Sequence, residues 1–152
     1  MTSLDLARKS LDKRLASLRE TQWATPPRGW LRAIREALGM TTTQMARRLG
    51  VSQPRIIALE KAEVSGAASI QTLREAAEAL GCTLVYAIVP TTTLDAMVRA
   101  RAAQRVEEDL DRLQHTMRLE NQAVGEPDLE DQRRRLIDDL LASSPRGLWQ
   151  DP

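Results

Sequence analysis

The sequence contains no phenylalanine, and only 3% of its 152 residues are aromatic. A hydrophobic core must therefore be built from Leu, Ile, Val, Met and Ala, a composition that favours helices because Ala and Leu are strong helix formers. The single cysteine, Cys82, excludes an internal disulfide and fits a reducing compartment. The N-terminus lacks the apolar core of a signal peptide, and no apolar run approaches the length of a membrane span. We expect a soluble, cytoplasmic protein.

Residue groups that could perform catalysis are also missing. His115 is the only histidine, and with one cysteine it cannot complete a zinc site. The sequence has no glycine-rich phosphate loop and no Ser, His and Asp arrangement typical of a hydrolase. We therefore predict a protein that is not an enzyme, with no catalytic residues, no cofactor and no metal.

The net charge of +1 conceals two blocks of opposite sign. Residues 28–61 hold seven basic and two acidic side chains, whereas residues 107–131 hold nine acidic side chains and two arginines. Such an asymmetry is typical of a chain in which one part meets an anionic partner and the other does not. Both blocks can also be explained as solvated helix faces. The interpretation as a nucleic-acid site depends on the motif that lies inside the basic block.

Prolines and glycines divide the chain into segments. Leu4, Leu11, Leu15 and Leu18 recur at helical spacing, which predicts an amphipathic helix over residues 3–21. The Thr-Pro-Pro-Arg-Gly run that follows ends this helix. We predict a mainly all-α fold in four segments: an N-terminal helix (1–25), a compact helical domain (28–81), a β-strand (82–90) and a C-terminal helical extension (91–152).

The run TTTQMARRLGVSQPRIIALEK at residues 41–61 has the pattern of two short helices that cross at a tight turn. Ala46 is small where the two backbones must approach, and Gly50 follows where the turn needs a left-handed backbone. Apolar residues stand at the offsets that tie both helices to the rest of the domain: Met45, Leu49, Val51, Ile56 and Leu59. Because these positions agree independently, the run predicts a helix-turn-helix motif.

Both helices of the motif carry start signals. Thr41 and Gln44 form a Thr-x-x-Gln capping box before the first helix, and Ser52 is well placed to cap the second. Pro54 fits the first turn of the second helix because its φ is already helical.

The segment from Trp30 to Leu80 resembles the XRE-type phage-repressor domain, in which a run like LGVSQPRI is typical. The resemblance implies a five-helix domain whose third helix, about Gln53–Ala62, enters the major groove of DNA. Carried over by position, Gln53 and Arg55 become the base-contacting residues, since Gln pairs with adenine and Arg with guanine. Ala58 offers only an apolar contact to a thymine methyl group.

The same resemblance implies contacts to the DNA backbone. Thr42 stands where many relatives place a phosphate-binding Gln, and its side chain is shorter. Because helix N-termini hold phosphates well, we expect Thr42, Thr43 and Gln44 to act together as a backbone clamp. The complete set of predicted DNA-contacting residues is Thr42, Thr43, Gln44, Ser52, Gln53, Arg55, Ala58 and Lys61.

Other charged residues of the motif are given structural roles. Glu60 would repel phosphate, and in the phage-repressor family its position pairs with an arginine of the first helix. Arg35 is the matching residue here, so the resemblance implies a structural ion pair between Arg35 and Glu60. Arg47 and Arg48 are either further DNA contacts or solvated surface residues.

The predicted strand at residues 82–90 is apolar on both faces and includes Leu84, Val85, Tyr86 and Ile88. An isolated strand cannot satisfy its backbone groups, and the simplest partner is the same segment of a second subunit. This arrangement is similar to the DNA-binding antitoxins of Hip-type toxin–antitoxin pairs. A homodimer would place two reading helices about 34 Å apart on a palindromic operator in double-stranded DNA. The alternative is pairing with another segment of the same chain.

Over its full length the sequence resembles the mobile mystery protein A family. The segments that carry the resemblance are PPRGWLRAIREALGM, the motif itself, LREAAEALGCTLVYAIVP, HTMRLENQA and the terminal PRGLW. Members of that family are typically encoded beside a protein with a Fic domain, an enzyme fold that transfers AMP to proteins. The resemblance implies a repressor that is the antitoxin or autorepressor of a Fic-type toxin–antitoxin pair, and we expect it to be associated with the nucleoid.

Thr116, Glu120 and Asn121 match the (Ser/Thr)-x-x-x-Glu-(Gly/Asn) pattern of Fic inhibitory helices. In those helices the glutamate pairs with an arginine of the Fic active site and blocks productive seating of the ATP γ-phosphate. Thr116 and Glu120 are four residues apart and would share one helix face. The alternative is an ordinary polar stretch at the end of a helix.

Two interpretations of the whole chain remain. In the first, an operator-binding repressor doubles as the antitoxin of a Fic-type enzyme. In the second, a stand-alone transcriptional regulator uses its C-terminal helices only to dimerise or pack. An adaptor that has kept the fold without binding DNA is a third and less favoured interpretation. Near the C-terminus, Trp149 either docks on its own domain or anchors a partner.

Overall fold

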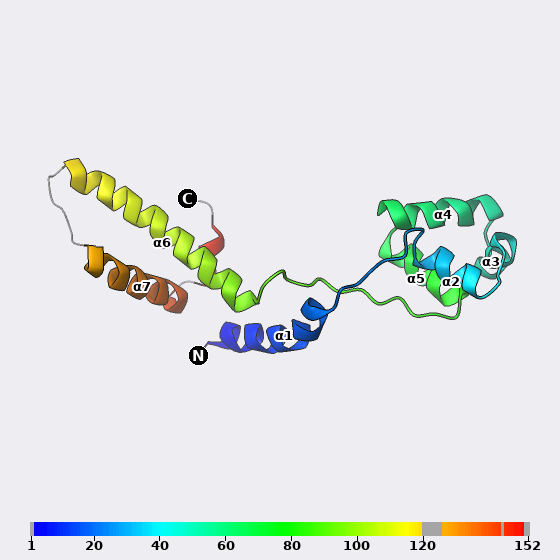
Figure 1. Ribbon diagram of the computed structural model, residues 1–152, viewed down its shortest axis with the longest axis horizontal. Coiled ribbons are helices and arrows are strands. Elements are labelled where there is room, and N and C mark those ends of the chain that lie inside the picture. The colour runs from blue at the N-terminus through cyan, green and yellow to red at the C-terminus, as the bar shows by residue number, and fades with distance from the viewer. Residues whose placement is uncertain (1, 120–125, 144, 151–152) are drawn as a thin grey trace. The chain divides into compact units, whose positions relative to one another are not determined.

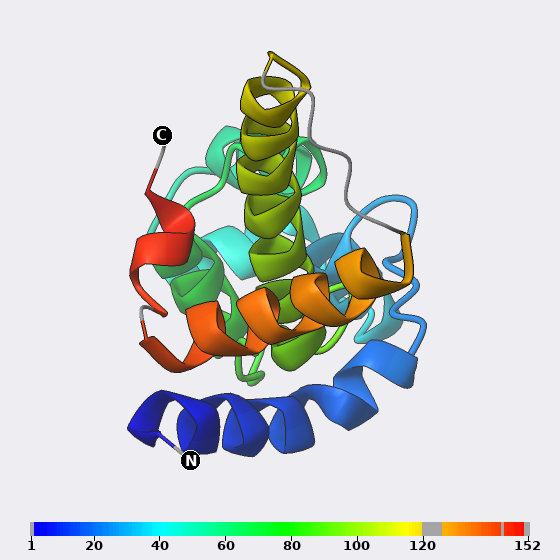
Figure 2. The ribbon, with the colours of Figure 1, turned by 90° about the vertical axis from the view of Figure 1, so that its left-hand side faces the viewer.

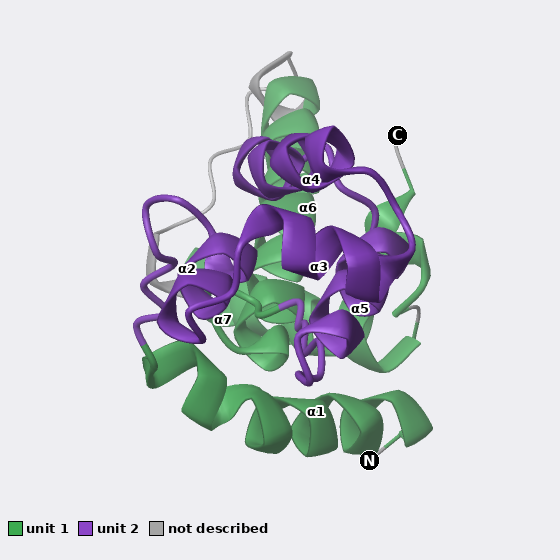
Figure 3. Cartoon of the chain, turned by 90° about the vertical axis from the view of Figure 1, so that its right-hand side faces the viewer, with its two compact units in different colours: residues 1–21, 89–152 green, residues 22–88 purple. Residues whose placement is uncertain are grey.

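The computed structural model describes residues 2–119, 126–143 and 145–150. It divides the chain into two compact units, one of residues 22–88 and one of residues 1–21 with 89–152 (Figures 1 and 3). None of the described helices is both long and apolar enough to cross a membrane. The helices are α1 (Ser3–Glu20), α2 (Trp30–Ala37), α3 (Thr42–Leu49), α4 (Gln53–Ser65), α5 (Ile70–Ala79), α6 (Leu94–Leu119) and α7 (Glu126–Ser143), followed by the short 3-10 helix η1 (Gly147–Trp149).

The unit of residues 22–88 contains four helices, α2 to α5, where the phage-repressor resemblance implied five (Figure 3). A fifth helix does not follow α5, because Gly81 adopts a left-handed backbone with φ of 73°. The residues after it are rich in β-branched side chains, which are weaker helix formers, and Pro90 follows them. Residues 82–89 therefore have no regular secondary structure.

The β-strand predicted at residues 82–90 is not formed within the described chain. Val85 and Ile88 in this segment are 84% and 88% exposed. A β-strand exists only where a second strand takes up its backbone hydrogen bonds, and no described segment supplies one. Pairing within one chain, the alternative left open by the sequence, is thus not found among the described residues.

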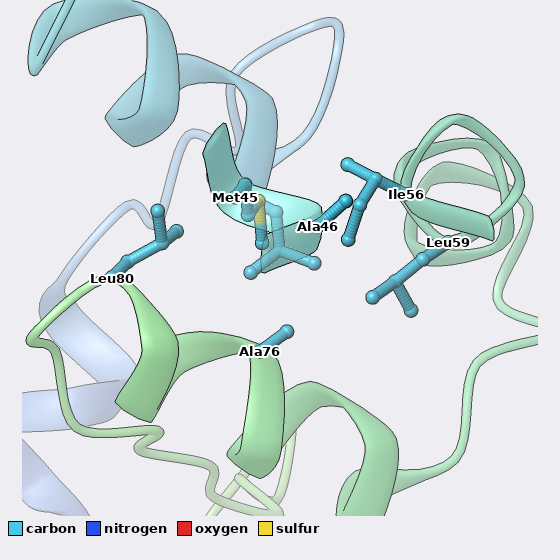
Figure 4. Packing of buried hydrophobic residues seen from close by; sticks show 7 residues of the cluster. Met45, Ala46, Ile56, Leu59, Ala76 and Leu80 are labelled. Atoms are coloured by element: carbon cyan, nitrogen blue, oxygen red, sulfur yellow. The ribbon is translucent and has the colours of Figure 1, made fainter. Parts of the chain in front are cut away.

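The core of the helix-turn-helix unit is small and aliphatic, as a chain without phenylalanine requires. Met45 and Ala46 from α3 meet Ile56 and Leu59 from α4, and Ala76 of α5 closes the cluster (Figure 4). Met45 and Ile56 are completely buried. The two alanines let the helix backbones approach closely. This packing fixes α4 against α3 and so decides which face of α4 points away from the core.

The second unit is built around α6, against which both α1 and α7 pack (Figure 2). Ala102, Val106 and Leu110 are buried on one face of α6 at spacings of four residues. Arg133 of α7 forms an ion pair with Glu107 of α6. Helix α1 contributes no buried residue of its own. Its contact with α6 therefore depends on half-buried and polar groups.

One such polar group is Asp12, which joins α1 to the beginning of α6. Its two carboxylate oxygens accept the backbone N–H groups of Leu94, at 2.7 Å, and Asp95, at 3.2 Å. These N–H groups lie in the first turn of α6, where no earlier carbonyl of the helix can accept them. Hydrogen bonding to Leu94 is the main reason that the pKa of Asp12 is lowered. Asp12 thus caps a helix that begins 82 residues later.

The C-terminal end of the second unit is held by Leu148 in η1, which is completely buried. Arg101 of α6 donates a hydrogen bond from Nε to the Leu148 carbonyl at 2.9 Å, and Arg105 donates one to the Gln150 carbonyl at 3.1 Å. Trp149, the residue expected either to dock here or to anchor a partner, is 59% exposed. The leucine rather than the tryptophan fastens this end of the chain.

Candidate nucleic-acid interface

The turn between α3 and α4 has the geometry that the sequence predicted at Gly50. Gly50 is left-handed, with φ of 71° and ψ of 32°. The backbone N–H of Val51 bonds to the Ala46 carbonyl at 3.0 Å, and Ala46 is almost fully buried. The predicted capping box is confirmed, because Thr41 Oγ1 accepts the Gln44 N–H at 3.1 Å and Gln44 Oε1 accepts the Thr41 N–H at 2.8 Å.

The predicted cap by the Ser52 side chain is not formed, although Ser52 occupies the N-cap position with an extended backbone. Pro54 in the first turn has no N–H to offer a capping side chain. The N–H of Arg55 bonds instead to the Ser52 carbonyl at 3.1 Å. The Ser52 residue lies exposed beside the amino end of α4.

Helix α4 is fastened on one side and open on the other. Ile56 and Leu59 are buried against α3, while the predicted DNA-contacting residues of α4 are exposed. These residues are Gln53, Arg55, Ala58 and Lys61. The structure therefore presents all four predicted residues of α4 to solvent.

A hydrogen bond between the two helices orients the Gln53 side chain. Its amide nitrogen, Nε2, donates to the hydroxyl oxygen of Thr42 at 3.0 Å. An amide nitrogen carries two N–H groups, so the second N–H and the carbonyl oxygen Oε1 remain for another partner. Gln53 therefore keeps one donor and one acceptor, the two groups that pair with adenine, while its bond to Thr42 orients the side chain.

The amino end of α3 lies beside this hydrogen bond. Thr43 and Gln44 are exposed in its first turn, and Thr42, which accepts the hydrogen bond from Gln53, is half-buried. The first N–H groups of a helix have no carbonyl partner within that helix and carry partial positive charge. The predicted clamp residues are therefore brought together at a helix end suited to a phosphate group.

The ion pair expected between Arg35 and Glu60 is present. Arg35 Nε lies 2.6 Å from Glu60 Oε1 and Arg35 Nη2 lies 3.2 Å from Oε2, with both side chains buried. A third bond runs from Arg35 Nη1 to the Met40 carbonyl at 2.9 Å. Hydrogen bonding to Glu60 raises the pKa of Arg35 above its ordinary value. The pair joins α2 to α4 and keeps the Glu60 charge away from the exposed face.

Glu63 has a structural role that sequence reasoning missed. Its carboxylate accepts the N–H groups of Trp30 and Leu31 at 2.7 and 3.0 Å, and so caps α2 from another helix. The N-cap residue of α2 is Gly29, whose φ is 86° and which has no side chain to do this. A Cβ at Gly29 would lie 2.8 Å from Glu63 Oε2. No local pattern in the sequence links residues so far apart.

The two arginines left open by the sequence differ in their surroundings. Arg48 donates from Nη1 to the Ala79 carbonyl at 3.1 Å, at the end of α5. This bond satisfies a carbonyl that has no partner within the helix, so Arg48 has a structural role. Arg47 is exposed.

The remaining predicted residues lie outside this surface. Leu84, Val85, Tyr86 and Ile88 belong to the segment after α5, where Tyr86 is 65% exposed. Thr116 is exposed on α6 and donates to the Arg112 carbonyl at 3.0 Å, while Glu120 and Asn121 lie outside the described residues. The described residues contain no group of three or more potential metal ligands.

Comparison with known families identifies residues 31–86 as a helix-turn-helix domain of the XRE type. The match begins at the second residue of α2, includes α3, α4 and α5, and ends within the segment that follows α5. A domain of this type is a DNA-binding regulatory domain, which suggests a transcription regulator. A comparison of the chain with curated proteins and with solved structures gave no match.

Proposed function

We propose that this protein is a sequence-specific transcriptional repressor that reads its operator with the exposed face of α4. One observation carries the proposal: Gln53 and Arg55 are exposed at the amino end of α4, while Ile56 and Leu59 anchor the same helix in the core. A helix fastened from behind with a free amino end is suited to enter the major groove, which admits an α-helix.

In the proposed complex each exposed side chain has a distinct partner. Gln53, held by Thr42, pairs with adenine, and Arg55 binds guanine O6 and N7. Ala58 contacts a thymine methyl group. The clamp at the start of α3, together with Ser52 and Lys61, binds phosphates. These backbone contacts set the register of the protein on the duplex and carry no sequence information.

The proposed repressor acts as a homodimer on a palindromic operator, joined through residues 82–90. Val85, Tyr86 and Ile88 are largely exposed, and Trp23 and Trp30 of the same unit are 68% and 48% exposed. Exposed aromatic and β-branched groups of this kind are typical of a surface that a partner covers. A second copy of the segment would also accept the backbone hydrogen bonds of a strand. Substitution of Val85 and Ile88 by Lys should yield monomers in sedimentation analysis.

DNase footprinting on the DNA upstream of its own gene tests the DNA-binding proposal. The wild-type protein should protect a palindromic site, and the Q53A/R55A variant should not, because each base contact contributes roughly 1–3 kcal/mol. The Q132A/R134A variant is a matched control: it removes the same two residue types, at the same spacing, from the exposed surface of α7. Wild-type protein that protects no site, or equal losses in both variants, would refute the proposal.

We further propose that the repressor is the antitoxin of a Fic-type enzyme. The full-length resemblance and the Thr116, Glu120 and Asn121 pattern support this role over that of a stand-alone regulator. Charge reversal, E120K, should release the AMP transfer activity of a co-expressed Fic partner. The D111K variant reverses an exposed carboxylate on α6, nine residues earlier in the sequence, and should leave inhibition intact. Inhibition that survives E120K would leave the stand-alone regulator as the better interpretation.

A further inference from the structure

An open groove of about 610 Å³ runs along one flank of α4. One side of it is α4 itself, and the other is formed by α2 and the loop before it. The groove lies on the flank of α4 that carries Ile57 and Lys61, and it reaches Thr42 at the start of α3. The residues that line the groove include Pro27, Arg28, Arg32, Thr42, Ile57 and Lys61.

The basic side chains that line this groove differ in whether they already form an ion pair. Arg32 forms an ion pair with Glu36 at 2.8 Å, and Arg35 is occupied by Glu60. Arg28 and Lys61 are exposed, and neither forms an ion pair with any described residue. The hydrogen bond from Arg32 lowers the pKa of Glu36, and the charge of Arg28 lowers it further. The groove is therefore positive, with two cations available to a ligand.

The position of the groove indicates which anion it meets. Thr42 lines the groove and also accepts the hydrogen bond from Gln53, so the groove adjoins the end of α4 that is proposed to read bases. A helix in the major groove has a phosphate backbone on each flank. Any duplex seated on Gln53 would therefore bring a line of phosphates along this side of α4.

We propose that Arg28, acting with Lys61 across this groove, binds a backbone phosphate of the operator. The inference rests on the proposed function and adds a DNA-contacting residue from outside the helix-turn-helix motif. An arginine can donate two parallel hydrogen bonds to a phosphate, and Lys61 supplies a second charge. The contact strengthens binding to all sequences equally, because every duplex offers the same phosphates.

The test compares the salt dependence of DNA binding by full-length wild-type protein and the R28A variant, because Lys61 is already assigned to a phosphate in the proposed function. The readout is the slope of log affinity against log salt concentration, measured on the protected operator and on an unrelated duplex. The variant should lower the magnitude of the slope by about 1, as expected for one lost phosphate contact. Its affinity should fall by the same factor on both duplexes. R28K, which keeps the charge, should retain most of the slope.

The R134A/R135A variant removes two exposed arginines of α7 and should leave the slope unchanged. A slope unchanged by R28A, or a loss confined to the operator, would overturn the assignment of Arg28 while leaving α4 as the reading helix. Wild-type protein that binds neither duplex would instead refute the proposed function together with this inference.

Discussion

Glu63 closes the amino end of a helix to which it does not belong: its Oε1 atom accepts the backbone N–H of Trp30 at 2.7 Å. The helix that it caps, α2, begins at a glycine N-cap without a side chain. A carboxylate here also offsets the partial positive charge of the helix end. Helix α4 thus presents the exposed contact residues and also supplies the side chain that caps α2.

The first prediction concerns this cap. Replacing Glu63 by Ala should lower the free energy of unfolding by about 1 kcal/mol, the usual cost of losing an N-terminal cap. Glu63→Gln should lose less, because the amide oxygen can still accept one N–H group. Urea unfolding followed by circular dichroism measures both. Glu78→Ala, at an exposed site on α5, is the control, and an equal effect there would contradict the capping role.

The second prediction concerns the buried pair of Arg35 and Glu60. Glu60→Ala leaves a buried guanidinium without its counter-ion and should cost about 3–5 kcal/mol of stability. Replacing both residues, as in R35M/E60L, should recover most of that loss because no buried charge remains. Chemical denaturation of the wild-type protein and the two variants gives the comparison. A double variant as unstable as Glu60→Ala would show that the pair is not the cause.

The third prediction concerns pH. The pKa of Asp12 in the folded protein lies below its ordinary value of 3.8, chiefly because of its hydrogen bond to the Leu94 N–H. Its contribution to stability is therefore fully present well above that value and is lost as pH falls through the folded-state pKa. Asp12→Asn should be less stable than wild type near neutral pH, and the difference should shrink in acid. Thermal unfolding over a pH series measures this.

Asp139→Asn, at an exposed carboxylate on α7, provides the control for the pH series. It should follow the wild-type curve at every pH. A gap between Asp12→Asn and wild type that stays constant into acid would show that the charge of Asp12 does not stabilise the start of α6.

The fourth prediction separates two neighbouring residues near the C-terminus. Leu148→Ala removes a completely buried side chain and should cost about 2–5 kcal/mol. Trp149→Ala removes the larger side chain, but one that is 59% exposed, and should have a much smaller effect on stability. Thermal unfolding of the two variants decides between them. A larger loss from Trp149→Ala would contradict the packing of η1 on α6.

The sequence by itself determined the parts of the motif that depend on neighbours within a few residues. The capping box of Thr41 and Gln44, the left-handed turn at Gly50 and the buried faces of α3 and α4 all follow from short spacings. Such features are encoded locally because a helix end needs a partner within one turn, and a helix face repeats every three or four residues. The ion pair of Arg35 with Glu60 could be predicted only from the family resemblance.

Only the tertiary structure decided which groups, far apart in the sequence, form hydrogen bonds and contacts with one another. Glu63 caps a helix that begins 33 residues earlier, and Asp12 caps one that begins 82 residues later. The burial of Leu148 rather than Trp149, and the lack of a strand partner for residues 82–90 among the described residues, were likewise decided by the tertiary structure. They depend on how completed helices pack. That packing brings together backbone and side-chain groups that have no fixed spacing along the chain. No local sequence pattern therefore predicts these contacts.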